Sequence, residues 1–200
     1  MTANPAAAGG PDQDGTGVDG TGPDGRAWLA VIDMQRVFAE ADSPWLTPKF
    51  ADIVAPVQRL VQSFGRRVTF TRFVAPDQPE GVWRRYYEEW PFALQSPDAR
   101  IYELVDEFGS RPTLDAATFG KWGPELAAQV GAGPLVLCGV TTDCCVLSTA
   151  LAAADAGVEV QVVIEGCTGM NDDTHEQALD VMRLYAPLIR VVKLADVSFP

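Results

Sequence analysis

The sequence has few of the residues that build metal sites and disulfide frameworks. It contains one histidine and four cysteines in 200 residues, and the cysteines show no paired C-x-x-C spacing. Because a structural zinc site takes about four Cys or His ligands at short spacings, we expect no metal and no other cofactor. The N-terminus lacks a basic start and an apolar core, so we expect no secretory signal, reduced thiols and a cytoplasmic location.

Long apolar runs and an excess of positive charge are also missing. No run reaches the ~18 apolar residues of a membrane-spanning helix, so we expect no membrane partner. Fifteen Lys and Arg against 27 Asp and Glu give a net charge of −12, which argues against a nucleic-acid partner. The expected partner is a small molecule, and the negative charge favours a cationic one only weakly.

Large apolar side chains are scarce in residues 1–26, which consist mainly of Gly, Pro, Asp, Ala and Thr. Such a segment buries too little apolar surface to offset the entropy lost on ordering. We therefore expect a disordered tail over residues 1–26 and a single domain over residues 27–200.

Apolar strand-like segments alternate with helical patterns through the rest of the chain. The expected strands span residues 28–32, 68–73, 113–114, 134–138, 158–164 and 188–194. The expected helices span residues 51–64, 123–130, 143–156 and 172–185. This alternation predicts an α/β fold with a doubly wound parallel sheet.

Cys145 lies at the turn between an expected strand and the helix that follows it. Unpaired backbone N–H groups at such a helix start carry partial positive charge, which lowers the pKa of a thiol placed there. The same groups could hold the oxyanion of an acyl-transfer intermediate. The alternative interpretation is that Cys145 is a small buried apolar residue, as most free cysteines are.

Asp33 follows the first expected strand, at the edge where open α/β sheets bind ligands. An aspartate at this point could equally serve only as a turn residue. A cysteine nucleophile needs a proton acceptor. The single histidine, His175, lies in a helix among acidic residues, where we expect it to be solvated. Asp33 is therefore the predicted acceptor, provided that the usual topology makes the two strands neighbours.

Residues 29–35 (Leu-Ala-Val-Ile-Asp-Met-Gln) and 137–146 (Leu-Cys-Gly-Val-Thr-Thr-Asp-Cys-Cys-Val) resemble the isochorismatase-like cysteine hydrolase superfamily. This superfamily includes nicotinamidases, N-carbamoylsarcosine amidohydrolases and streptothricin hydrolase. The similarity runs from about residue 27 to the C-terminus. It implies a Rossmann-like α/β/α sandwich, a triad of Asp, Lys and Cys, and a homo-oligomer.

Carried over to this sequence, the resemblance makes Asp33 the general base and acid and Cys145 the nucleophile. It implies a cis peptide bond between Val140 and Thr141 that directs the N–H groups of Thr141 and Cys145 at one point. The adjacent Cys144 is not at the family position, and we expect it to pack inward.

The lysine of the family pattern stands six residues before an aromatic residue, which here is Trp122, and counting back gives Ala116. Lys121 is the nearest cation; its stem could reach the site, although the family register argues against it. Ala116 could be a deliberate inactivating substitution, a natural divergence with Lys121 compensating, or the mark of a binding pseudoenzyme. We favour an inactivated variant, because the surrounding motif is intact.

Metal-dependent nicotinamidases of this family carry two histidines after the second strand, and residues 71–77 contain none. Isochorismatases proper lack the nucleophilic cysteine. The resemblance therefore favours a metal-independent amidohydrolase that cleaves a small amide, carbamoyl or lactam compound through a thioester. The alternatives are a vinyl-ether hydrolase that uses Asp33 alone and a non-catalytic binding or scaffold protein.

The connection after the second expected strand is rich in aromatic residues. Such a loop could cover a substrate pocket or form a subunit interface. If it covers a pocket, the expected substrate-binding residues are Phe38, Arg72, Trp83, Tyr87 and Trp90.

Overall fold

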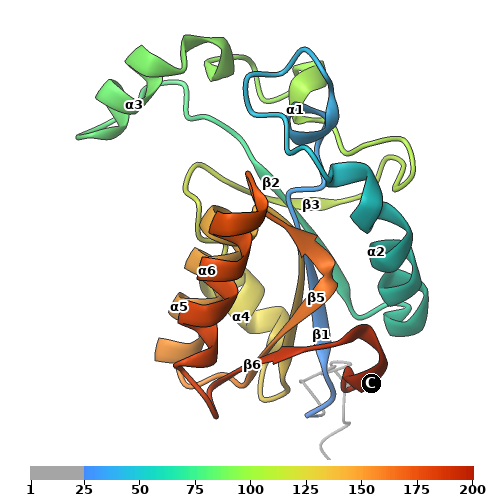
Figure 1. Ribbon diagram of the computed structural model, residues 1–200. Helices are drawn as coiled ribbons and strands as arrows, with labels where there is room; N and C mark the ends of the chain where they lie inside the picture. The colour runs from blue at the N-terminus through green and yellow to red at the C-terminus, as the bar shows by residue number, and fades with distance from the viewer. Residues whose placement is uncertain (1–24) are drawn as a thin grey trace, which may run out of the picture.

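A six-stranded parallel sheet organises residues 25–200, the part of the chain that the computed structural model describes (Figure 1). The order of the strands is β3-β2-β1-β4-β5-β6. Their bounds are β1 Trp28–Ile32, β2 Val68–Phe73, β3 Thr113–Ala116, β4 Leu135–Val140, β5 Val160–Thr168 and β6 Ile189–Val192. The doubly wound parallel sheet is confirmed. The predicted tail, apart from its last two residues, lies outside the described residues.

Helices cover both faces of the sheet. Figure 1 shows α2 on one face and α4, α5 and α6 on the other, which confirms the α/β/α sandwich. Their bounds are α1 Arg36–Ala39, α2 Phe50–Phe64, α3 Trp83–Glu89, α4 Pro124–Val130, α5 Leu147–Asp155 and α6 Asp172–Arg183. Among the residues described, no helix is both long and apolar enough to cross a membrane.

The central strands are apolar along their whole length because both of their faces are covered. All six residues of β4 are buried, as are four of the five in β1. Helix α2 places Ile53, Val57, Leu60 and Phe64 against the sheet at the spacing of one helical face. Burying each such side chain contributes about 1.5–3 kcal/mol.

The order of the strands determines where the candidate site lies. The chain leaves β1 for β2 on one side, whereas β4 pairs with β1 on the other side, with Ile32 opposite Gly139. Ligands of open α/β sheets bind at such a switch point, beyond the carboxyl ends of the strands. The segments that follow β1 and β4 therefore meet there, and α1 and α3 lie at the same end of the molecule (Figure 1).

Two regions differ from the prediction. The helix predicted over residues 143–156 begins with a π-helical turn, Thr142–Val146, and becomes α-helical only at Leu147. The aromatic connection after β2 contains α3, which the sequence pattern did not predict because its two turns have aromatic residues on more than one face.

Candidate active site

Asp33 sits directly after β1 and is completely buried. Its φ of 50° lies in the left-handed region, which aspartate tolerates better than most residues. Thr71 of β2 holds it twice: the Thr71 hydroxyl donates to Oδ1 at 2.7 Å and accepts from the Asp33 N–H at 3.2 Å. The carboxylate is thereby fixed at the carboxyl end of the sheet.

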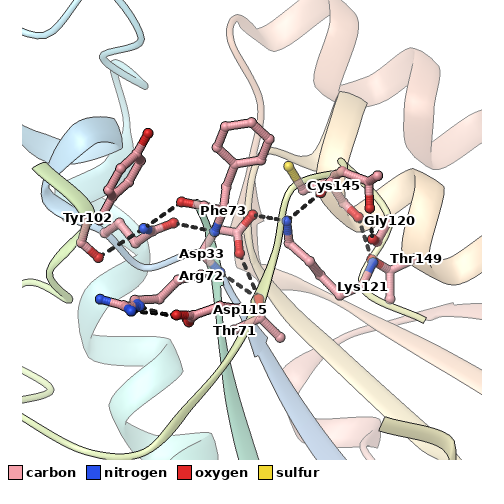
Figure 2. Close-up of polar contacts among 12 residues, drawn as sticks. Asp33, Thr71, Arg72, Phe73, Tyr102, Asp115, Gly120, Lys121, Cys145 and Thr149 are labelled. Atoms are coloured by element: carbon pink, nitrogen blue, oxygen red, sulfur yellow. Dashed lines mark hydrogen bonds and ion pairs between the residues drawn. The ribbon is translucent and has the colours of Figure 1, made fainter. Parts of the chain in front are cut away.

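Lys121, in the loop after β3, forms an ion pair with Asp33 (Figure 2). Its Nζ lies 3.1 Å from Oδ2 of Asp33, and both side chains are fully buried. The ammonium also donates to the carbonyl oxygen of Thr118 at 2.7 Å and lies 5.2 Å from the centre of the Phe73 ring. Burying two charges costs several kcal/mol per ion, so each needs the other in this position.

This ion pair corrects the prediction that Ala116 stands at the lysine position of an inactivated variant. Ala116 ends β3, pairs with Phe73 in the sheet and accepts a hydrogen bond from the N–H of Val74. The loop after β3 turns back over Phe73, and that turn brings Lys121 to Asp33. A spacing counted along the chain cannot show such a turn.

Cys145 lies in the π-helical turn after β4 and is 3% exposed. Thr149, one helical turn later, connects it to Lys121: the Thr149 hydroxyl donates to the Cys145 carbonyl at 2.6 Å and accepts from the Lys121 N–H at 2.9 Å. Sequence reasoning missed Thr149. Its only signal was a hydroxyl residue four positions after the cysteine, in a helix of mostly apolar residues.

The pKa of the Cys145 thiol is raised well above its ordinary value, chiefly by burial. The interaction with Asp33 raises this pKa further, whereas the Lys121 ammonium lowers it. The prediction of a lowered thiol pKa was wrong, because burial and the neighbouring carboxylate outweigh the positive groups. The thiol is therefore protonated at neutral pH.

The turn that carries Cys145 packs tightly against β1. Gly139 has a φ of 115°, and a Cβ there would lie 2.0 Å from the carbonyl oxygen of Ile32, so only glycine fits. The peptide bond between Val140 and Thr141 is cis, as predicted. The role of the Thr141 and Cys145 N–H groups in binding an oxyanion stays a prediction.

A cavity of about 270 Å³ lies against Cys145. Its walls come from helices, loops and strand ends that are far apart in the sequence. They comprise Phe38, Pro44, Trp45, Phe73, Tyr86, Trp90, Phe119, Thr141, Cys144, Cys145 and Met170.

The isochorismatase domain family matches residues 27–193. The chain belongs to the isochorismatase family. Isochorismatase domain-containing protein 2 of Bos taurus is 39% identical over 159 residues, which cover 80% of this chain and 68% of that protein. The Xenopus laevis protein of that name is 25% identical, and the match covers 78% of this chain and 66% of that protein.

Solved structures share the fold of this isochorismatase-family chain. A cysteine hydrolase from Pseudomonas syringae has a TM-score of 0.73 at 19% identity, covering 86% of this chain and 90% of that one. Nicotinamidase PncA from Bacillus subtilis has a TM-score of 0.68 at 20% identity, covering 84% and 99%. A pyrazinamidase of Pyrococcus horikoshii in complex with zinc gives 0.68 at 22% identity, with the same coverage.

Two of the five predicted pocket residues, Phe38 and Trp90, line the cavity of this isochorismatase-family protein. The prediction was wrong for Arg72, because alternate side chains of a strand face opposite ways: Thr71 and Phe73 face the site, whereas Arg72 faces away and pairs with Asp115 at 2.8 Å.

The prediction was also wrong for Trp83 and Tyr87, which lie four residues apart on one stripe of α3. Trp83 packs against Phe119, with ring centres 5.3 Å apart, and Tyr87 is 1% exposed. Tyr86 and Trp90 form the neighbouring stripe, and this stripe faces the cavity.

Two residues that line the cavity were not predicted to do so from the sequence. Trp45 lies in a loop without periodicity, yet its ring is within 6.1 Å of those of Phe38, Phe73, Tyr86, Trp90 and Phe92. Cys144, expected to pack inward, instead lines the cavity.

His175 contacts the π-helical turn that carries Cys145. His175 is half-buried, with Nδ1 2.8 Å from the Thr142 hydroxyl, so the expectation that it is solvated was wrong. Burial lowers its pKa. Within residues 25–200, no three His, Cys, Asp or Glu side chains gather closely enough to hold a metal ion.

Proposed function

We propose that this isochorismatase-family protein is an active, metal-independent cysteine amidohydrolase that cleaves a small amide, carbamoyl or lactam compound. The observation that carries the proposal is the buried Asp33–Lys121 ion pair acting on Cys145, the residue of the three that lines the cavity. A carboxylate, an ammonium and a thiol in this arrangement supply a base, a charge partner and a nucleophile.

The first step that we propose is attack of the Cys145 sulfur on the substrate carbonyl carbon. The thiol is protonated at neutral pH because burial raises its pKa, so its proton must be taken as the sulfur attacks. Asp33 is the acceptor: its carboxylate is completely buried, pairs with Lys121 through Oδ2, and interacts with the Cys145 thiol closely enough to raise the pKa of that thiol. The Lys121 ammonium compensates the negative charge of the carboxylate before the transfer and of the developing intermediate after it.

In the second step the tetrahedral intermediate collapses. The C–N bond breaks, Asp33 returns the proton to the leaving nitrogen, and an acyl thioester remains on Cys145. A water molecule then attacks the thioester carbonyl and gives a proton to Asp33. The C–S bond breaks, the carboxylic acid leaves, and the proton returns to the Cys145 sulfur.

The geometry supports this reaction over the alternatives. A vinyl-ether hydrolase using Asp33 alone would make no use of Cys145, the residue of the three that lines the cavity. A binding protein has no need for a buried ion pair, which costs desolvation energy that apolar residues avoid.

Two further parts of the proposal are a cytoplasmic location, in line with four free thiols, and a homo-oligomer.

The test is to incubate the protein with a panel of small amides, measure the amine or ammonia released, and search quenched samples for an acyl adduct on Cys145. We expect turnover and an adduct, both abolished in Cys145→Ala and Asp33→Asn. Cys167→Ala is the matched control, because that thiol is buried away from the cavity and its loss should leave both signals. Full activity of Cys145→Ala would contradict the proposal, and so would the absence of turnover and adduct with every amide.

A further inference from the structure

The cavity beside Cys145 has apolar walls and no charged side chain. Six aromatic rings form most of the wall: Phe38, Trp45, Phe73, Tyr86, Trp90 and Phe119. The polar side-chain groups among the lining residues, all of which lie within residues 25–200, are two hydroxyls, two thiols and the N–H groups of two indole rings. Neutral groups of this kind can hydrogen-bond to an amide, but none of them can neutralise a substrate carboxylate.

The nearest cation is not available to a substrate. Lys121 has no exposed surface, and its ammonium is already engaged by Asp33, the Thr118 carbonyl and the Phe73 ring. The Tyr86 hydroxyl stays neutral at physiological pH, because burial raises its pKa to about 12. The net charge of −12 also repels anions from the molecule as a whole.

The size and chemistry of the walls favour one kind of ligand. A volume of about 270 Å³ lies just below the ~300–1,000 Å³ of pockets for drug-sized ligands, so the acyl group must be small. Flat apolar rings gain most from aromatic walls, through stacking and edge-to-face contacts.

We propose that the substrate is a small uncharged amide whose acyl group is a planar apolar ring, and that amides bearing a carboxylate are excluded. This inference rests on the proposed hydrolase function for turnover but not for binding. The surface that the walls present to a ligand is almost entirely apolar, so a ring without hydrogen-bonding atoms matches it best. A phenyl carboxamide should therefore bind better than a pyridine carboxamide of the same shape.

Met170 is the position that can reverse this selectivity. It lines the cavity from the loop between β5 and α6 and is 38% exposed, so a longer polar side chain fits without entering the core. A cation at residue 170 would supply the charge partner that the walls lack.

The first experiment measures binding to Cys145→Ala by calorimetry, so that turnover is not needed. The matched pair is 4-nitrobenzamide and 4-carbamoylbenzoate, which have nearly the same shape and differ in charge. We expect the neutral compound to bind more tightly by a factor of about 100 or more, and benzamide to bind more tightly than nicotinamide. Equal or tighter binding of 4-carbamoylbenzoate would overturn the inference, and so would failure of both compounds to bind.

The second experiment compares Met170→Arg with Met170→Leu in the same background. The arginine should raise the affinity for 4-carbamoylbenzoate roughly tenfold or more, whereas the leucine should leave it unchanged. No gain with arginine would contradict the placement of residue 170 at the cavity.

Binding of neutral ring amides without turnover in the unsubstituted protein would defeat the hydrolase proposal alone. Cys145-dependent turnover of 4-carbamoylbenzoate would defeat the ring-amide inference alone.

Discussion

The buried ammonium of Lys121 is held by three different partners: a carboxylate, a backbone carbonyl and an aromatic face. Each partner offsets part of the hydration that the ammonium loses. An isolated lysine at this depth would be strongly destabilising. Lys121 therefore belongs to a unit with Asp33, and changing either residue alone leaves a buried charge without its partner.

Replacing Lys121 by methionine should lower the free energy of unfolding by about 3–5 kcal/mol, because the Asp33 carboxylate is left unpaired. The double variant Asp33→Asn/Lys121→Met should be more stable than Lys121→Met alone, since no buried charge remains. Urea denaturation of the unsubstituted protein, the two single variants Asp33→Asn and Lys121→Met, and the double variant measures the coupling free energy between the two residues. Both variants that lack Lys121 should also lose turnover.

Lys49→Met is the matched control for this cycle. Lys49 also pairs with an aspartate, Asp172, but its side chain is 56% exposed, so its loss should lower the free energy of unfolding far less than the loss of Lys121 does. Strictly additive effects of the Asp33 and Lys121 substitutions would contradict the proposed unit.

Elements with a strong repeat were predictable from the sequence, and irregular ones were not. β1, β4 and α2 show unbroken apolar runs or a clear helical period, and their predicted bounds agree with the structure to within a few residues. The π-helical turn after β4 carries no such period. Its extra residue per turn changes the directions of Cys144 and Cys145, and Cys144 lines the cavity in place of packing inward as expected.

The π-helical turn also holds the loop that closes one side of the cavity. Asp143 accepts hydrogen bonds on Oδ2 from the N–H of Met170, at 3.1 Å, and from the hydroxyl of Thr174. Its other oxygen is buried and accepts no hydrogen bond within the described residues. One side chain thus connects the turn after β4 to the loop before α6.

Asp143→Ala should free this loop, because the Met170 N–H loses its acceptor. We expect faster amide hydrogen exchange at residues 169–174 and a loss of about 1–3 kcal/mol in stability. Asp143→Asn should keep most of the protection, since its amide oxygen can still accept both hydrogen bonds. Asp180→Ala, on the exposed side of α6, serves as the control. Unchanged exchange in Asp143→Ala would show that other contacts hold the loop.

At the scale of the whole molecule, topology rules located two of the three clustered residues. Asp33 and Cys145 follow strands that a doubly wound sheet makes neighbours, so their proximity was predictable. Lys121 lies in the connection from β3 to β4, and most of the cavity wall comes from segments that follow other strands of the sheet. Their positions depend on how long loops fold back over the sheet, as at Phe73 and Trp45, and no local pattern specifies such a path.

Each of the four thiols in the described structure makes the free energy of unfolding depend on pH at high pH. Burial is the largest cause of a raised pKa at Cys138, Cys144, Cys145 and Cys167, and that of Cys167 reaches about 12. Because the folded-state pKa exceeds the ordinary value of 9.0, unfolding releases a proton from each thiol. Their contribution is complete below about pH 9, and the free energy of unfolding falls as the pH rises above it.

Each such thiol contributes a slope of about 1.4 kcal/mol per pH unit between its unfolded and folded pKa values. Cys167→Ala should therefore flatten the decline in unfolding free energy by up to that slope between about pH 9 and pH 12. Urea denaturation at intervals from pH 6 to pH 11 measures the difference. Below pH 8 the two proteins should give parallel curves, offset only by the lost packing, which serves as the internal control. Curves that stay parallel above pH 9 would mean that the Cys167 thiol does not hold its proton in the folded state.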